Sequence, residues 1–388
     1  MSSVFVLGLI LSAPPSILLA GRLVLEAPNN NDLPDSVELL PVLGPQKKPN
    51  VYVIILDAYG RSDQLEKTFG FNNSKFLNFL EDKEFFILKN SYSSYPDSTF
   101  SITSLFNMDY HKEFNPGNYD ERFKTPVFRI FQKAGYRTHV LLGYRGGVCP
   151  PKTSVCLSTG SEGVGLIGIL GQRLLQLTPL FEIILKYFPQ LYGDTRTMVD
   201  DLRVVLASTD LSSPSFVFAH IGFPHPPFTR AETCAADIRK DVSNEENYAI
   251  ESAGRYVKQL RCVNKQMRQL LDELIRKDPE AVVIIQSDHG SGFVYVQSKG
   301  DTKFNFSGSG DWRINAFNDR YGIINAWRVP ADCQNKLYST MGTVNTFRYL
   351  FTCLGIMNLD VLKNKSYWPD FATKRFFLLQ TDGVLDKP

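Results

Sequence analysis

Two short apolar runs, far apart in the chain, both end in side chains that can bind a metal ion. Val51–Leu56 leads directly into Asp57, and residues 281–286 lead to Asp288 and His289. Runs this short and rich in β-branched residues are typical of central strands that are buried on both faces. Asp57 alone could equally be a turn-capping residue. A second strand with the same kind of ending favours a shared site at the carboxyl ends of parallel strands.

Strand and helix patterns alternate through the rest of the chain. Ser74 and Thr343 are the expected N-caps of two helices. Further strands are expected at residues 84–89, 136–142, 215–220 and 322–329, and helices at residues 74–83, 97–107, 126–134, 166–188, 196–207, 256–275 and 344–354. This alternation predicts an α/β fold with a central, mostly parallel sheet and helices on both faces.

The chain has 388 residues, which is enough for a large core, and its formal net charge is only +2. No basic stripe and no nucleic-acid-binding motif is present, so we expect no nucleic-acid partner. Oligomeric state is not determined by these features.

The N-terminal segment differs from the rest of the sequence. Residues 2–21 are mostly apolar and carry no charged side chain, although Pro14 and Pro15 interrupt them. Residues 1–25 are therefore expected to be a membrane segment or a signal-like stretch, or the last membrane helix of a longer protein. The alternative is a buried or disordered segment. Residues 26–50 are expected to be a linker.

Six cysteines are present, and no two of them have the spacing of a zinc ribbon. Cys149 and Cys156 flank a Pro-Pro loop and could form a short disulfide in an oxidising compartment. Cys353 lies in an apolar helical pattern, which favours a buried free thiol.

A hydroxyl-rich segment follows Pro96 and Asp97, which are expected to start a helix. Ser98 and Thr99 then lie in its first turn, where free N–H groups and the helix dipole stabilise negative charge. Such a hydroxyl can serve as a nucleophile once it is activated, for example by a metal ion. The alternative is that these residues only cap the helix.

Two histidines follow another predicted strand. His220 ends the strand, and His225 lies in the proline-flanked loop just beyond it. An imidazole held between prolines suits contact with an anionic group or protonation of a leaving oxygen. The alternative is a loop histidine that packs on prolines.

These four segments (residues 55–61, 95–107, 218–228 and 284–290) occur in the order found in the alkaline-phosphatase and sulfatase-like superfamily. The chain most resembles a bacterial, membrane-linked branch of sulfatase-like hydrolases and transferases, akin to phosphoethanolamine and phosphoglycerol transferases. The resemblance extends over residues 50–368. It implies an alkaline-phosphatase-like fold and makes residues 51–388 the catalytic domain. It also implies a membrane-associated protein whose catalytic domain is periplasmic or at the cell surface.

The resemblance also implies roles for individual residues. Asp57, Asp288 and His289 would bind one divalent metal ion (Zn, Mn or Mg) together with Ser98. Ser98 would be the nucleophile and would be transiently phosphorylated, with Thr99 as the alternative one residue away.

Three further residues would face the substrate. His225 would contact the transferred group or the leaving oxygen, and His220 and Arg145 are candidate substrate contacts. The expected substrate is a phosphodiester of the lipid head-group type, or another lipid-linked molecule.

The chain departs from the sulfatase pattern where residues 98–102 lack the Pro and Arg of that motif, which argues against sulfate-ester hydrolysis by that mechanism. No histidine follows His289, which favours one metal over two. We therefore expect a metal-dependent phosphotransferase or phosphodiesterase that forms a phospho-Ser/Thr intermediate. The alternatives are a hydrolase of sulfate or phosphate monoesters, and a catalytically inert binding domain of the same fold.

Overall fold

The computed structural model describes residues 42–43, 47–114, 125–143, 150–158, 197–208, 212–235, 252–294 and 311–379. The expected membrane segment, most of the linker, the helix expected at 166–188 and Arg145 lie outside these residues. Within the described part, no helix combines the length and the apolar character needed to cross a membrane. The domain boundaries given above stay a prediction.

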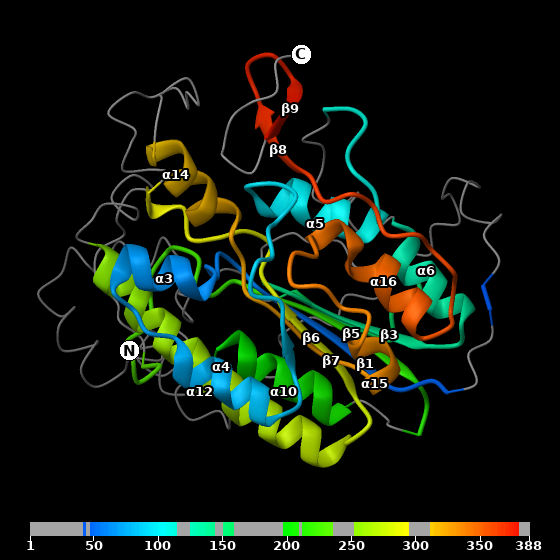
Figure 1. Ribbon diagram of the computed structural model, residues 1–388. Coiled ribbons are helices and arrows are strands. Elements are labelled where there is room, and N and C mark those ends of the chain that lie inside the picture. Colours follow the sequence, from blue (N-terminus) through cyan, green and yellow to red (C-terminus); the bar gives the residue numbers. More distant parts are fainter. Residues whose placement is uncertain are drawn as a thin grey trace, which may run out of the picture.

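The described residues form a seven-stranded central sheet in the order β2-β7-β6-β1-β5-β3-β4 (Figure 1). Five of these strands run parallel, β7 runs antiparallel to β6, and β2 pairs antiparallel with β7. The strands are β1 Val51–Leu56, β2 Phe86–Ile87, β3 Arg137–Leu142, β4 Val155–Ser158, β5 Ser215–Ile221, β6 Val282–Gln286 and β7 Asn325–Arg328. A separate hairpin pairs β8 Ser366–Asp370 with β9 Arg375–Leu379.

Helices cover both faces of the sheet, as the alternating pattern predicts (Figure 1). One face packs against α5 Ser98–Asn107, α6 Pro126–Lys133 and α16 Thr346–Cys353. The other packs against α3 Ser62–Phe69, α4 Ser74–Asp82, α10 Met198–Ser208 and α12 Ala253–Lys277. Further helices are α14 Asp311–Tyr321, α15 Ala331–Gln334 and the 3₁₀ turn η4 Thr343–Asn345.

Strand β1 is the centre of this core. Its side chains alternate between the two faces, with Val53 and Ile55 on one side and Ile54 and Leu56 on the other. Each of them is at most 1% exposed. Burying a side chain of this size stabilises the fold by roughly 1.5–3 kcal/mol. The continuous apolar run is therefore explained by burial on both faces.

Three local expectations are wrong. Asn73 occupies the N-cap position of α4, and Ser74 is the first helical residue. Thr343 begins η4, and α16 follows only after this 3₁₀ turn. Cys353 is not a free thiol, because it forms a disulfide with a cysteine 20 residues earlier, Cys333. The apolar helical pattern around Cys353 does not reveal a partner on a different element.

A second disulfide joins Cys234 to Cys262 on α12. Cys149, the expected partner of Cys156, lies outside the described residues.

Asn50 connects the starting ends of three neighbouring strands. Its carbonyl accepts from the backbone N–H of Val282, at 2.9 Å. Its side-chain oxygen accepts from the N–H of Ser215, and its amide nitrogen donates to Asp278, each at 2.8 Å. Strands β1, β5 and β6 are thus held in register at the edge where β1 begins.

Candidate metal centre and active site

The carboxyl ends of three adjacent parallel strands meet at one edge of the sheet. Strand β1 lies between β5 and β6 and pairs with both. Asp57 follows β1, His220 lies near the end of β5, and Asp288 and His289 follow β6. Open α/β sheets bind ligands at this edge. Two carboxylates and two imidazoles, from segments up to 232 residues apart in sequence (289 − 57), are therefore brought together.

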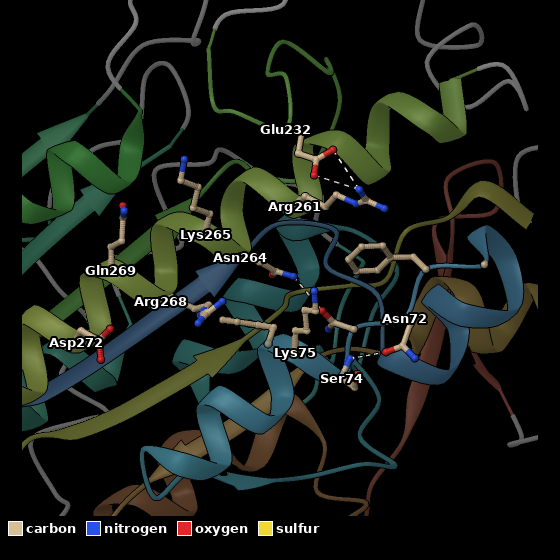
Figure 2. A pocket seen from close by; sticks show the side chains of 14 residues that line it. Asn72, Ser74, Lys75, Glu232, Arg261, Asn264, Lys265, Arg268, Gln269 and Asp272 are labelled. Atoms are coloured by element: carbon tan, nitrogen blue, oxygen red, sulfur yellow. Dashed lines mark hydrogen bonds and ion pairs between the residues drawn. The ribbon is translucent and has the colours of Figure 1, made fainter.

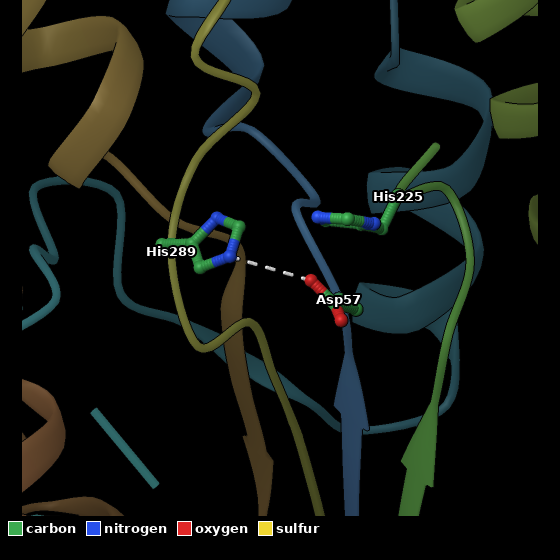
Figure 3. A group of neighbouring side chains, drawn as sticks. All are labelled: Asp57, His225 and His289. Atoms are coloured by element: carbon green, nitrogen blue, oxygen red, sulfur yellow. Dashed lines mark ion pairs between the residues drawn. The ribbon is translucent and has the colours of Figure 1, made fainter. Parts of the chain in front are cut away.

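These side chains are close enough to share an ion. His289 Nε2 lies 3.4 Å from Asp57 Oδ1, and His220 Nε2 lies 3.4 Å from Asp57 Oδ2. Each imidazole nitrogen is also 3.7 Å from Asp288 Oδ2. Figure 3 shows His225 as a further imidazole beside the Asp57 carboxylate.

The donors fall into two groups that share Asp57. One contains Asp57, His225 and His289, and the other contains Asp57, His220 and Asp288. Within each group the donor atoms lie within 4.8 Å of one another. For comparison, two ligands of a tetrahedral zinc ion are separated by about 3.3 Å, given bonds of about 2.0–2.1 Å.

The carboxylate oxygens also indicate that a cation belongs here. Both oxygens of Asp57 and Oδ2 of Asp288 are buried and accept no hydrogen bond in the described structure. An unsatisfied buried carboxylate is costly unless it is paired or binds a metal ion. The donor set of carboxylates and imidazoles therefore fits a divalent metal. The expected number of one ion stays a prediction, since the donors form two groups.

Backbone contacts orient the ligands. His289 Nδ1 lies 2.9 Å from the Gly290 carbonyl, and His225 Nδ1 lies 2.6 Å from the Pro226 carbonyl. A carbonyl only accepts, so each Nδ1 carries a proton and donates it, which leaves Nε2 available as a ligand or, once protonated, as a proton donor. Asp288 Oδ1 accepts from the N–H of His289 at 3.0 Å, which leaves Oδ2 directed at the site.

Electrostatics in the site favour the metal-binding protonation states. Burial alone raises the pKa of Asp57, but His225, His220 and His289 outweigh it and hold the pKa well below its usual range. Burial lowers the pKa of His289 to about 4, helped by the charge of Arg320 and opposed by Asp288 and Asp57. Asp57 is therefore ionised and His289 neutral at neutral pH.

Ser98 is the first residue of α5, and the N-terminal part of this helix contacts the segment that carries Asp288. Asp97 is the N-cap of this helix, and its carboxylate accepts from the N–H of Phe100 at 3.0 Å. One turn further on, the Ser101 hydroxyl donates to the Asp288 carbonyl at 2.7 Å. The helix start expected at Asp97 is confirmed. The Ser101 bond also fixes the N-terminal part of α5 against the segment that carries Asp288. Ser98 is buried, whereas Thr99 is half-buried.

Asp97 has an unusual environment for a capping residue. Burial raises its pKa to about 6, partly offset by the Phe100 N–H and by Arg320, while the nearby Asp288 charge adds to the increase. A cation bound at Asp288 would remove that repulsion. Asp97 therefore belongs electrostatically to the same site.

Arg320, at the end of α14, is a site residue that sequence reasoning missed. The Gly290 N–H donates to the Arg320 carbonyl at 2.7 Å. Gly292 has a φ of +80°, and a Cβ there would lie 2.6 Å from Arg320 Nη1. The loop after His289 therefore makes room for this guanidinium beside the candidate ligands. In the sequence Arg320 is only a charged residue near the end of a helix. Nothing in that context predicts that it lies beside the candidate ligands.

The structure brings most of the expected site residues together. Asp57, Asp288 and His289 lie together at the carboxyl edge, and their role as ligands, together with Ser98, stays a prediction. His220 and His225 also lie among the potential metal donors, and their expected contact with the substrate stays a prediction. No role follows for Arg145, which the described residues do not include.

The comparisons with known proteins agree with this fold. The family model described as Sulfatase matches residues 49–356. That span is most of the chain, so the chain belongs to the sulfatase family, and the superfamily resemblance seen in its motifs is confirmed. No curated protein matches the sequence.

Solved structures share the fold at low sequence identity. One is the C-terminal periplasmic domain of EcEptC from Escherichia coli in complex with Zn. It has a TM-score of 0.58 and 13% identity, and the match covers 89% of this chain and 97% of that one. Another is a Bacteroides thetaiotaomicron protein (BT33494S-sulf), from work on the metabolism of multiple glycosaminoglycans. It has a TM-score of 0.54 and 13% identity, with coverage of 88% and 89%. These similarities confirm the alkaline-phosphatase-like fold.

Proposed function

We propose that this protein is a metal-dependent phosphotransferase or phosphodiesterase that acts on phosphodiesters of the lipid head-group type. The observation that supports it most is the meeting of Asp57, Asp288 and His289 with the N-terminal turn of α5, which carries Ser98. This arrangement combines carboxylate and imidazole donors with a hydroxyl in a region of positive helix potential. Phosphoryl transfer depends mainly on such positioning and charge stabilisation.

The reaction has two steps. Ser98 Oγ attacks the phosphorus of the diester, its proton passes to water, and the Oγ–P bond forms as the bond to the leaving alcohol breaks. His225 donates a proton to the leaving oxygen. The Ser98 intermediate keeps the second ester group of the diester. An acceptor alcohol or water then attacks its phosphorus and gives its proton to His225, and the bond from phosphorus to Oγ breaks as Oγ takes a proton from water. The positive end of the α5 dipole and the guanidinium of Arg320 stabilise negative charge on the phosphoryl oxygens.

The metal would be held by Asp57 and Asp288 together with the imidazoles of His220 and His289. His225 Nε2 would then be left to act as the acid. When bound, it lowers the pKa of a coordinated hydroxyl and neutralises charge on the phosphoryl group. Zinc is the first ion to test, because the E. coli EcEptC domain with this fold was solved as a complex with Zn.

The same comparison supports an extracytoplasmic catalytic domain, since the EcEptC domain is periplasmic. The disulfides Cys234–Cys262 and Cys333–Cys353 agree with it, because disulfides persist mainly in oxidising compartments. Attachment to a membrane through residues 1–25 belongs to this proposal as well.

A second candidate function is hydrolysis of sulfate esters, which membership in the sulfatase family favours. The residues around Ser98 oppose it, because the segment reads Ser-Thr-Phe-Ser-Ile and lacks the Pro and Arg of the sulfatase motif.

The test compares three chromogenic substrates, namely a phosphodiester, a phosphomonoester and a sulfate ester, each with and without a chelator. We expect cleavage of the diester to exceed that of the other two and to disappear with the chelator. Ser98→Ala should be inactive, and mass spectrometry of the acid-quenched wild-type enzyme should find, on the peptide that contains Ser98, a phosphoryl group that still carries the remaining ester of the substrate. A preference for the sulfate ester would contradict the proposal in favour of the second candidate, and phosphate on Thr99 would shift the nucleophile by one residue.

A further inference from the structure

A second recess lies away from the metal donors, between α12 and the connection from α3 to α4. It has a volume of about 890 Å³, and Gly70–Phe76 form one wall (Figure 2). Lys265, Arg268 and Gln269 project from α12 on the other side. None of the candidate metal ligands lines it. Ligand sites typically measure about 300–1,000 Å³, which is far more than one inorganic ion needs.

The wall of this groove is fixed by a closed set of hydrogen bonds. Tyr59 Oη donates to Asn264 Oδ1 at 2.6 Å, and Asn264 Nδ2 donates to Asn73 Oδ1 at 2.9 Å. Asn73 Nδ2 donates back to Tyr59 Oη at 3.0 Å. Asn73 and Asn264 line the groove from opposite sides, so this ring joins its two walls. The shape is thus set before a ligand arrives, which reduces the entropy lost on binding.

The charges along the groove do not cancel. Both lining carboxylates are already paired: Glu232 with Arg261 through two contacts of 3.1 Å, and Asp272 with Lys83 at 2.6 Å. In the described part of the chain, Lys75, Lys265 and Arg268 have no carboxylate within ion-pair distance. Arg268 is instead held over the ring of Phe79, at 5.1 Å. Three cations are thus left to face the groove.

We propose that this groove binds an anionic oligosaccharide, a sugar chain that carries sulfate or phosphate groups. Lys75, Lys265 and Arg268 supply charge-assisted hydrogen bonds to the oxyanions. The side-chain amides of Gln269 and Asn72 are placed for sugar hydroxyls. A flexible sugar chain can enter a recessed groove, whereas a flat lipid surface cannot. The groove therefore favours an oligosaccharide over a membrane. Binding in this groove is independent of the proposed phosphotransferase reaction, because it requires neither the metal nor Ser98.

The test measures binding of fluorescent dextran oligosaccharides of one length to the full chain, in sulfated, phosphorylated and uncharged forms, at low and high salt. All titrations contain a chelator, so that binding at the metal centre does not contribute. We expect the anionic forms to bind, more weakly at high salt, and the uncharged form not to bind. Preference for sulfate or for phosphate identifies the ester that the natural chain carries.

A matched pair of variants locates the site. Lys265→Gln/Arg268→Gln removes two cations from the groove, and Lys258→Gln/Arg276→Gln removes two exposed cations of the same helix outside it. We expect about a tenfold loss of affinity in the first variant and less than about twofold in the second. Equal losses in both variants, no loss in the first, or binding of the uncharged chain with equal affinity would each overturn the proposal.

Anionic lipid vesicles provide the remaining comparison. Binding of vesicles but not of anionic oligosaccharides would mean that the groove contacts a membrane, and the proposal would be wrong. Failure of the phosphodiesterase assay leaves this test unaffected, because binding is measured without metal or turnover.

Discussion

His289 and His139 are both buried on strands of the same sheet or directly after them, and burial lowers the pKa of each to about 4. Their surroundings differ. His289 lies beyond the end of β6, with Asp57 and Asp288 within 3.7 Å of its Nε2. His139 lies within β3, where neither ring nitrogen has a hydrogen-bond partner among the described residues, and Arg137 is the nearby charge.

The difference shows that burial and a perturbed pKa do not by themselves define a site. At the carboxyl edge the neutral imidazole is accompanied by three carboxylate oxygens, both of Asp57 and Oδ2 of Asp288, that accept no hydrogen bond from the described residues. A cation would stabilise all of these groups. Within β3 the neutral imidazole only fills space. The following predictions test this contrast, beginning with the largest expected effect.

Replacing Asp57 by Asn should abolish both metal binding and turnover. Asp57 belongs to both donor groups, so its loss leaves His289 without its closest carboxylate and makes its surroundings more like those of His139. We expect activity to fall by about 10⁴-fold. Metal content, measured by elemental analysis after gel filtration, should fall in parallel. An inactive variant that kept its full metal content would contradict the ligand assignment.

Replacing Ser98 by Ala should remove the nucleophile and lower turnover by at least about a thousandfold. The variant should keep most of its metal, because the carboxylates and imidazoles remain. Thr99→Ala is the matched control, since it deletes the neighbouring hydroxyl on the same helical turn, and it should keep most of the activity. The opposite ranking would assign the nucleophile to Thr99.

Replacing Arg320 by Gln should lower kcat/KM by roughly tenfold to a hundredfold, with unchanged metal content, because the proposed mechanism uses the guanidinium to stabilise the phosphoryl oxygens and not to hold the metal. Arg320→Lys should restore part of the loss. Gly292→Ala, which keeps the charge but places a Cβ against the guanidinium, should reproduce part of the effect. Arg375→Gln, at an exposed position on β9, is the control. Loss of metal from Arg320→Gln would instead indicate a purely structural role.

Replacing His139 by Leu should have the smallest effect and should leave activity unchanged. The unfolded chain takes up a proton at this histidine as the pH falls below about 6.5, whereas folded His139 stays neutral until about pH 4. The wild-type free energy of unfolding therefore decreases through that window, and the variant should lack this contribution. We expect the advantage of the variant to grow by about 2 kcal/mol between pH 7 and pH 4.5 in urea denaturation. A difference that did not change with pH would contradict a buried, neutral His139.

The sequence predicts the sheet well, and also the edge at which the candidate metal donors lie. Both depend on the burial of individual strands and on the residues directly after them, which are local features of the sequence. A strand buried on both faces must be apolar, so polar residues directly after Leu56 or Gln286 mark its end. Parallel strands then bring these ends together. The helix that begins after Asp97 follows equally from a local capping pattern.

What sequence reasoning missed depends on contacts between distant segments. Arg320 reaches the site only because Gly292 leaves space for it, and the Cys333–Cys353 pairing requires α15 and α16 to be neighbours. His220 was identified, but its place between two carboxylates became visible only with the register of β5 on β1. The sequence also does not show which cations of the groove are paired, because the carboxylate partners of the paired ones lie on other elements.

The hydrogen bonds of Asn50 have a mechanical consequence. Asn50 directly precedes the central strand, and its bonds to Ser215 and Val282 attach it to the strands on either side. A force transmitted through the preceding chain would act along the axis of β1 and load both of its ladders in shear. Parallel ladders loaded in this way must break many hydrogen bonds together rather than one after another. The described domain would thus resist tension applied at the start of β1, while the candidate metal donors at the other end of the same strand stay in place.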